Sequence, residues 1–160
     1  MEERGRVLDR FLVEVFGEIL RTEEHSLARR AERLSLRELH LIDAVCRAVD
    51  EGRDNRSAAI AAERQITAGT LTTAVSALER KGYLERRRSR RDKRVVRIYP
   101  TEKGREAQRH HAAFHRELVE EVLAVLSKDE ARVFTRALDR LAGFFRRKHR
   151  NGADGAVTCE

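Results

Sequence analysis

A single proline, Pro100, occurs in 160 residues, so little in this chain prevents it from folding into helices. Apolar residues recur at helical spacing over residues 3–30, where Leu8 and Leu12 begin one stripe. The same periodicity predicts helices over 35–50, 57–64, 67–81, 101–126 and 127–148. Two S-x-x-E sequences, starting at Ser35 and Ser127, are capping boxes that mark helix starts. The sequence therefore predicts a mainly helical chain.

Two short segments break this pattern. Residues 83–88 and 94–99 are predicted to be two short strands of a small β-hairpin, and the second is rich in β-branched and aromatic residues, which makes the fold class α+β. Between residues 80 and 97, ten basic residues face only two acidic ones, a local charge of +8 in a chain whose net charge is +7. The rest of the chain is therefore close to neutral. Such a basic stripe favours a polyanionic partner, and the alternative is a solvated loop.

The two helices before the hairpin have the arrangement of a helix-turn-helix, in which the second helix enters the major groove of DNA. Deep entry requires small side chains, and the polar face of residues 67–81 carries such residues as far as residue 76. They are Ala68, Gly69, Thr70, Thr72, Thr73 and Ser76. The alternative is an ordinary amphipathic helix, although solvent-facing helices usually carry Lys and Glu instead.

A basic hairpin directly after a helix-turn-helix is a wing that can follow the phosphate backbone or insert arginine into the minor groove. Its predicted contacts are Arg88, Arg90, Arg91, Asp92, Lys93 and Arg94. Asp92 would repel phosphate, so we expect it either to pair with a neighbouring arginine or to form part of a turn. Residues 35–100 are thus predicted to be a winged helix-turn-helix domain, 1–34 and 101–148 a helical dimerisation region, and 149–160 a flexible tail.

The segments 78–84 (LERKGYL), 91–94 (RDKR) and 99–104 (YPTEKG) resemble the MarR family of bacterial transcription regulators. The family pattern is L-E-x-x-G, a wing bearing D-x-R, and L-T-x-x-G, with Pro100 here in place of the last leucine. The order of elements agrees over about residues 5–147. The resemblance implies a winged helix-turn-helix with long N- and C-terminal dimerisation helices. It also implies a homodimer that binds a palindromic operator in double-stranded DNA.

Three further segments, 36–40 (LRELH), 69–73 (GTLTT) and 111–115 (HAAFH), resemble the subgroup that represses fatty-acid synthesis genes. The resemblance implies a repressor with acyl-acyl carrier protein as corepressor, and DNA contacts at Thr70, Thr72, Thr73 and Ser76. An apolar slot for the acyl chain is expected between the first and fifth helices, and the alternative is that the same residues form a dry core without a ligand. Its candidate residues are Phe11, Phe16, Ile19, Leu20, His40, Phe114 and Leu118.

His111 and His115 are four residues apart, a spacing that places both on one helix face and suits a metal ion. The zinc-responsive members of the same family use a glutamate, a histidine and a histidine pair on the corresponding helices. The matching candidates here are Glu24 (or Glu23 or His25), His40, His111 and His115. A zinc-responsive regulator is therefore the alternative function. The histidines alternatively have only a structural role, and no cofactor is then required.

Other classes are less consistent with the sequence. There is no Gly-rich phosphate loop, no G-x-S-x-G and no H-E-x-x-H, so no enzyme is predicted. Exposed strand aromatics suited to RNA are lacking, while a helical module that binds an acidic protein stays an alternative. No apolar run reaches membrane-spanning length and no secretory signal is present, which predicts a cytoplasmic protein. Cys46 and Cys159 form no Cys-x-x-Cys pair, in keeping with a reducing compartment.

Overall fold

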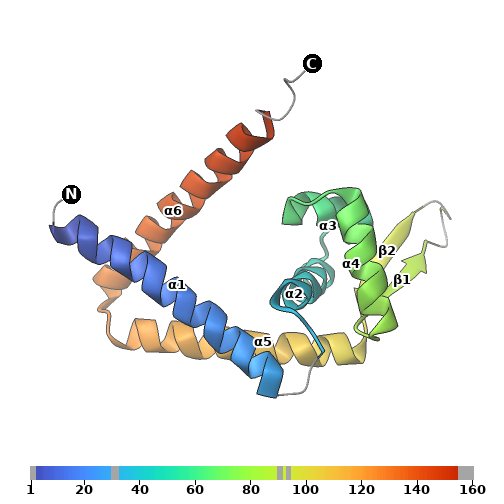
Figure 1. Ribbon diagram of the computed structural model, residues 1–160, viewed down its shortest axis with the longest axis horizontal. Helices are drawn as coiled ribbons and strands as arrows, with labels where there is room; N and C mark the ends of the chain where they lie inside the picture. Colours follow the sequence, from blue (N-terminus) through green and yellow to red (C-terminus); the bar gives the residue numbers. More distant parts are fainter. Residues whose placement is uncertain (1–2, 30–32, 90–91, 93–94, 155–160) are drawn as a thin grey trace. The chain divides into compact units, whose positions relative to one another are not determined.

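The computed structural model describes residues 3–29, 33–89, 92 and 95–154 (Figure 1). It confirms a mainly helical chain with one small hairpin. The elements are α1 (Glu3–Arg29), α2 (Leu36–Asp50), α3 (Ser57–Arg64), α4 (Ala68–Arg80), β1 (Leu84–Arg88), β2 (Val96–Pro100), α5 (Glu102–Ala124) and α6 (Lys128–Asp154). They form two compact units, residues 1–113 and 114–160, so that α5 contributes to both.

The core of the first unit is formed by the apolar stripes of α2, α3 and α4 together with β2. Its largest fully buried side chains are Ile42, Val45, Cys46, Ile60, Leu71, Val75, Leu78 and Ile98. Helical periodicity predicts inward positions for Ile42, Cys46, Ile60, Leu71, Val75 and Leu78, and these are confirmed. It does not predict the burial of Val45, and the predicted inward residue Val49 is only half-buried. Full burial of one such aliphatic side chain stabilises the fold by about 1.5–3 kcal/mol. The position of α4 is therefore set by three side chains, spaced three or four residues apart, that pack into this core.

Local signals determine where these helices begin and end. Ser35 and Glu38 form a complete capping box at the start of α2. Gln65 ends α3 in the left-handed conformation (φ 54°), and the Thr67 hydroxyl caps α4 by accepting a hydrogen bond from the Thr70 amide. Gly82 follows α4 with φ 80°, the left-handed conformation that a glycine directly after a helix is expected to adopt. The turn between α3 and α4 is consequently only three residues long.

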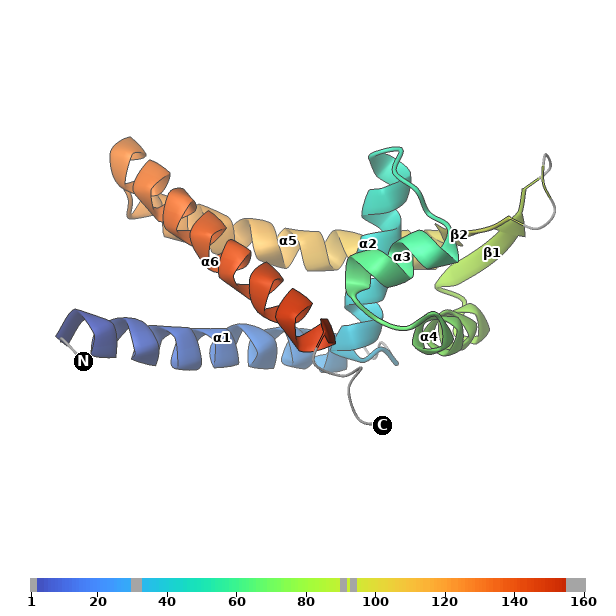
Figure 2. The same ribbon diagram turned by 90° about the horizontal axis from the view of Figure 1, so that it is seen from above.

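The hairpin lies beside α4, as Figures 1 and 2 both show. β1 and β2 are antiparallel, with Arg86 opposite Ile98 and Leu84 opposite Pro100. The second strand begins and ends slightly later than predicted and includes Pro100, because Leu84 still pairs with it. Thr101 then caps α5 by accepting a hydrogen bond from the Gly104 amide at 3.1 Å.

The apolar stripe of α1 is largely uncovered in the single chain. Leu8, Phe11 and Phe16 are 58%, 47% and 54% exposed, whereas Leu27 near the end of the helix is buried. The predicted helix extent is confirmed, but the face contributes little to the core of this unit. Among the described helices, none is long and apolar enough to cross a membrane.

The second unit consists of the end of α5 and the whole of α6. α6 continues to Asp154, so the expectation that residues after Lys148 leave the helix is wrong for 149–154. The segment contains no proline, and nothing else there terminates the helix at Lys148. Helical periodicity over 101–126 predicts an inward position for Val125, and this is wrong, because Val125 lies just beyond the end of α5 and is 80% exposed.

Candidate nucleic-acid interface

The first half of α4 presents a face of small side chains to solvent. Five of the six predicted contact residues are exposed, namely Ala68, Gly69, Thr70, Thr72 and Thr73. The opposite face carries Leu71 and Val75, which are buried. Because nothing larger than threonine projects from the exposed face, its backbone can approach a groove closely. Hydroxyl groups on this face can donate to or accept from phosphates and base edges.

Ser76, the sixth predicted contact, is placed differently. It is half-buried, and its hydroxyl accepts hydrogen bonds from Arg86 Nη1 and Nη2 at 3.2 and 3.3 Å. Arg86 also forms an ion pair with Glu79. The end of α4 therefore uses Ser76 to contact the hairpin. The sequence signal that was missed is the spacing of Ser76 and Glu79, which place a hydroxyl and a carboxylate on the side facing β1.

The described part of the wing carries exposed basic charge. Arg88 is exposed at the end of β1, and Arg87 lies over the Tyr99 ring at 4.8 Å while pairing with Glu85. The main chain of Asp92 forms a turn, since its carbonyl accepts from the Val95 amide at 3.0 Å. The remaining predicted wing residues, Arg90, Arg91, Lys93 and Arg94, lie outside the described residues. The predicted pairing of Asp92 with a neighbouring arginine involves these same residues and stays a prediction.

The base of the wing is tied to the loop before α3 by Asn55, for which the turn-forming sequence 51–55 (EGRDN) predicts a turn and no further role. Asn55 is buried. Its side-chain Nδ2 donates to the Ile98 backbone carbonyl at 2.9 Å, and its backbone carbonyl accepts from the Ile98 backbone amide at 3.0 Å. Arg97 Nη1 donates to Asn55 Oδ1 at 2.7 Å. Hydrogen bonds from Arg56 lower the pKa of the neighbouring Asp54 to about 2. Asp54, beside this junction, therefore stays ionised throughout the physiological pH range.

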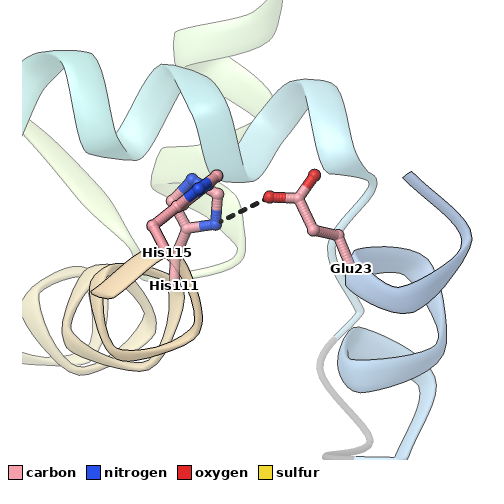
Figure 3. Close-up of side chains that lie close together, drawn as sticks. All are labelled: Glu23, His111 and His115. Carbon is pink, nitrogen blue, oxygen red and sulfur yellow. Dashed lines mark ion pairs between the residues drawn. The ribbon is translucent and has the colours of Figure 1, made fainter. Parts of the chain in front are cut away.

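A second polar cluster lies where α1, α2 and α5 meet in the first unit. Glu23 Oε1 is 3.4 Å from His111 Nδ1, and Glu23 Oε2 is 3.8 Å from His40 Nε2. The His40 and His111 rings are 5.3 Å apart, and both Glu23 and His111 are buried. Figure 3 draws Glu23 with His111 and with His115, which follows one turn later on α5.

The glutamate of this cluster is Glu23, whereas Glu24, the candidate ranked first from the sequence, is exposed. Glu23 is four residues before the buried Leu27, so both lie on the inward face of α1. His25 is exposed as well. The rotation of α1 about its own axis decides which of the three candidates faces the histidines. The sequence spacing does not determine that rotation.

The predicted acyl-chain residues of α1 do not form an enclosed slot within the first unit. Phe11, Phe16 and Leu20 are 47%, 54% and 45% exposed, and Ile19 is half-buried. His40 belongs to the cluster with Glu23. The other two candidates, Phe114 and Leu118, lie on the part of α5 that belongs to the second unit.

Comparisons with known proteins identify the family of this fold. The family model described as transcriptional regulator SarA/Rot matches residues 28–110, which is more than half of the chain. The crystal structure of Streptococcus pneumoniae FabT in complex with DNA is 35% identical, with a TM-score of 0.79, and the match covers 88% of this chain and 96% of FabT. No match is found among curated proteins.

Two more distant structures share the fold alone. The S. aureus MepR–DNA complex is 17% identical with a TM-score of 0.68, and the match covers 86% of this chain and 95% of MepR. A MarR family protein from Bacillus stearothermophilus is 23% identical with a TM-score of 0.62, and covers 91% and 99%. The matching family model, together with the identity to FabT, shows that this chain belongs to the MarR-type winged helix-turn-helix transcription regulators, which bind DNA and are not enzymes.

Proposed function

We propose that this chain is a cytoplasmic homodimeric repressor of fatty-acid synthesis genes that binds a palindromic operator with acyl-acyl carrier protein as corepressor. The observation that carries the proposal is the 35% identity to pneumococcal FabT over 88% of the chain, in a structure solved with DNA. The exposed small-residue face of α4 beside a basic hairpin supports the same mode of DNA binding. The segments 36–40, 69–73 and 111–115 supply the resemblance to the fatty-acid subgroup.

The uncovered apolar faces support a dimer. Large side chains on α1 and α6 are more exposed than a monomer of this size tolerates, and a second copy would bury them. They include Val7, Leu8, Phe11, Phe16, Val133, Phe134, Leu138, Phe144 and Phe145. Sedimentation of the purified chain at micromolar concentration should give twice the monomer mass of 18.4 kDa. A monomer that still binds a palindromic site with full affinity would contradict the dimer.

The exposed apolar residues of α1 also bear on the effector. Phe11, Phe16 and Leu20 are available to line a slot for an acyl chain once further helices cover them. Transfer of a long acyl chain from water into such a slot would be favourable by about 0.8 kcal/mol for each CH₂ buried. The acyl group, rather than the carrier protein alone, should therefore control DNA affinity.

The test is a fluorescence anisotropy titration on a palindromic site from the region upstream of the protein's own gene. It compares the protein alone, with long-chain acyl-acyl carrier protein, and with the unacylated carrier as the matched control. We expect the acylated carrier alone to tighten operator binding. An equal effect of both carriers, or no effect of either, would remove the acyl corepressor from the proposal.

A zinc-responsive regulator is the second candidate, because the Glu23–His40–His111 cluster has a suitable donor set. Zinc in proteins is bound by imidazole nitrogen and carboxylate oxygen, and tetrahedral bonds of about 2.1 Å separate the ligand atoms by about 3.4 Å. Glu23 Oε1 lies 3.4 Å from His111 Nδ1, close to this value, whereas Glu23 Oε2 lies 3.8 Å from His40 Nε2, so an ion shared with both histidines would be held by both carboxylate oxygens. His115, one turn along α5, is a further candidate ligand. Such an ion would join α1 to α2 and α5.

Zinc titration calorimetry separates this candidate from the acyl model. Glu23→Gln and His111→Ala should each abolish tight zinc binding, whereas Glu24→Gln on the exposed side of α1 should preserve it. Operator binding measured with zinc and with a chelator then shows whether the metal regulates DNA affinity. If the wild-type protein does not bind zinc at micromolar concentration, the cluster is structural.

A further inference from the structure

We infer that Arg86, a β1 residue whose guanidinium binds α4, positions the recognition helix α4 and thereby sets operator specificity. The inference rests on the assignment of α4 as the helix that reads DNA. It concerns a residue that neither the basic stripe nor the small-residue face singles out. In this role Arg86 acts through α4 and makes no contact with DNA itself.

Arg86 makes more hydrogen bonds than any other side chain of the described wing. Its backbone amide donates to Glu79 Oε1 at 2.8 Å, and its guanidinium forms an ion pair with the same carboxylate. Nη1 and Nη2 donate to Ser76 Oγ at 3.2 and 3.3 Å. Nη2 also donates to the Thr72 carbonyl at 3.0 Å. Main chain and side chain of one strand residue thus both bind the same helix.

The three partners span two turns of one helix side. Thr72, Ser76 and Glu79 are separated by four and three residues, so they line up along the face of α4 that is turned toward β1. The buried stripe of Leu71, Val75 and Leu78 holds a different side of the helix against the core. Rotation of α4 about its own axis is opposed by both sets of contacts, because they act on different faces.

Arg86, the β1 residue in these contacts, is itself held in place. Arg86 lies opposite Ile98, which is fully buried and hydrogen-bonded to Asn55 on the loop before α3. The guanidinium therefore connects α4 to a part of β1 that cannot shift without disturbing the core. A planar guanidinium can satisfy a carbonyl, a hydroxyl and a carboxylate together, whereas a lysine ammonium at the same point cannot reach all three.

The link to specificity is Thr72, which is both a partner of Arg86 and a residue of the predicted reading face. Its carbonyl accepts from Arg86, while its side chain is exposed on the predicted reading face together with Thr73. Base contacts require placement of a side chain to within about 0.5 Å, whereas phosphate attraction is far less sensitive to position. A loosened α4 should therefore lose operator affinity and keep non-specific affinity.

The test measures two dissociation constants for the full-length protein at several salt concentrations, one for the operator and one for unrelated duplex DNA of equal length. The variants are Arg86→Lys and Arg86→Met. Arg87→Lys and Arg87→Met on the same strand are the matched controls, because Arg87 is exposed and contacts Glu85 and Tyr99 instead of α4. Any attraction that Arg87 exerts on phosphate acts on both DNAs alike.

We expect both Arg86 variants to lose about tenfold or more in the ratio of operator to non-specific affinity, with the salt slope of Arg86→Lys unchanged. The Arg87 variants should keep that ratio. The inference is overturned if Arg86→Lys retains wild-type specificity while Arg86→Met lowers the salt slope by about one unit, because Arg86 would then be a phosphate contact.

Glu79→Gln keeps the test decisive if the Arg86 variants fail to fold. It removes the charge partner and leaves Arg86 in place. If Arg86 positions α4, this variant should have a lower ratio of operator to non-specific affinity. It should also bind non-specific DNA more tightly, since Glu79 no longer neutralises Arg86. An unchanged ratio would overturn the inference. Failure of the wild-type protein to prefer its operator would instead overturn the assignment of α4 as the reading helix, and the inference with it.

Discussion

Lys81 Nζ donates hydrogen bonds to both carboxylate oxygens of Glu38, at 2.7 and 2.8 Å. Lys81 directly follows α4, and Glu38 is the capping-box residue in the first turn of α2. The pair therefore joins the end of the recognition helix to the beginning of the core helix. Glu38 also accepts from the Ser35 amide at 2.8 Å, so one carboxylate stabilises both a helix start and a contact between helices.

We expect Glu38→Gln to lower the free energy of unfolding by about 1–2 kcal/mol at pH 7, because it removes a charged cap and an ion pair. Burial raises the pKa of Glu38, but hydrogen bonds from Lys81 and Ser35 outweigh it and lower the pKa overall, below the ordinary value of 4.5. A lowered pKa gives stability that is present above 4.5 and is lost as the pH falls through the folded-state value.

Urea unfolding of Glu38→Gln and wild type at pH 7 and pH 3 tests this dependence, with the exposed Glu24→Gln as the control. The difference between Glu38→Gln and wild type should shrink at pH 3, because this pH is below 4.5 and the Glu38 carboxyl of the unfolded wild-type chain is then mostly protonated, which favours unfolding. An equal difference at both pH values would show that the charge of Glu38 contributes nothing.

Thr72→Glu should abolish operator binding and leave the dimer intact, since a carboxylate on the exposed face of α4 would meet phosphate and base edges. Thr72→Ser, which keeps the hydroxyl, should retain most of the affinity. Anisotropy titration gives the affinity and sedimentation gives the mass. Retained operator binding by Thr72→Glu would mean that α4 is not the reading helix.

Arg88→Ala should weaken operator and non-specific binding several-fold and reduce the salt slope by about one unit, because Arg88 is exposed on the wing and suited to a phosphate. The same result is expected for Arg94→Ala from the sequence pattern. The measurement is the logarithm of affinity against the logarithm of salt concentration. An unchanged slope for both variants would exclude the wing from DNA contact.

Gly104→Ala should destabilise the fold by about 1–3 kcal/mol, since an added Cβ would lie 2.2 Å from the Tyr83 carbonyl oxygen. α5 starts so close to the base of β1 that only glycine fits there. Gly143→Ala is the control within α6, where the nearest atoms are arginine side-chain ends at 3.4 and 3.7 Å. That change should stabilise the helix by about 0.5–1 kcal/mol. Thermal unfolding of both variants gives the comparison.

Cys46 should be unreactive in the native protein. Burial raises the pKa of its thiol to about 11, so only about one thiol in a thousand is ionised at pH 8. In a Cys159→Ser variant, a thiol reagent at pH 8 should therefore label the protein only when urea unfolds it. Rapid labelling without denaturant would mean that the α2 core opens readily.

The order of helices and strands was predictable because each depends on local signals. The capping box at Ser35, the left-handed Gly82 and the stripe of Leu71, Val75 and Leu78 are all readable within a few residues of the element they define. The end of α6 was not predictable, because no strong stop signal lies near Lys148. The small exposed face of α4 followed from helical periodicity alone, apart from Ser76.

The sequence by itself determined the helix-turn-helix, the hairpin and the concentration of positive charge on it, since periodicity and charge are properties of consecutive residues. Only the tertiary structure decided that Glu23 and not Glu24 meets His111, that Ser76 contacts Arg86, and that Asn55 holds the wing. These contacts join residues on different elements. They depend on how each helix is rotated against the core, which the packing of side chains distant in sequence sets.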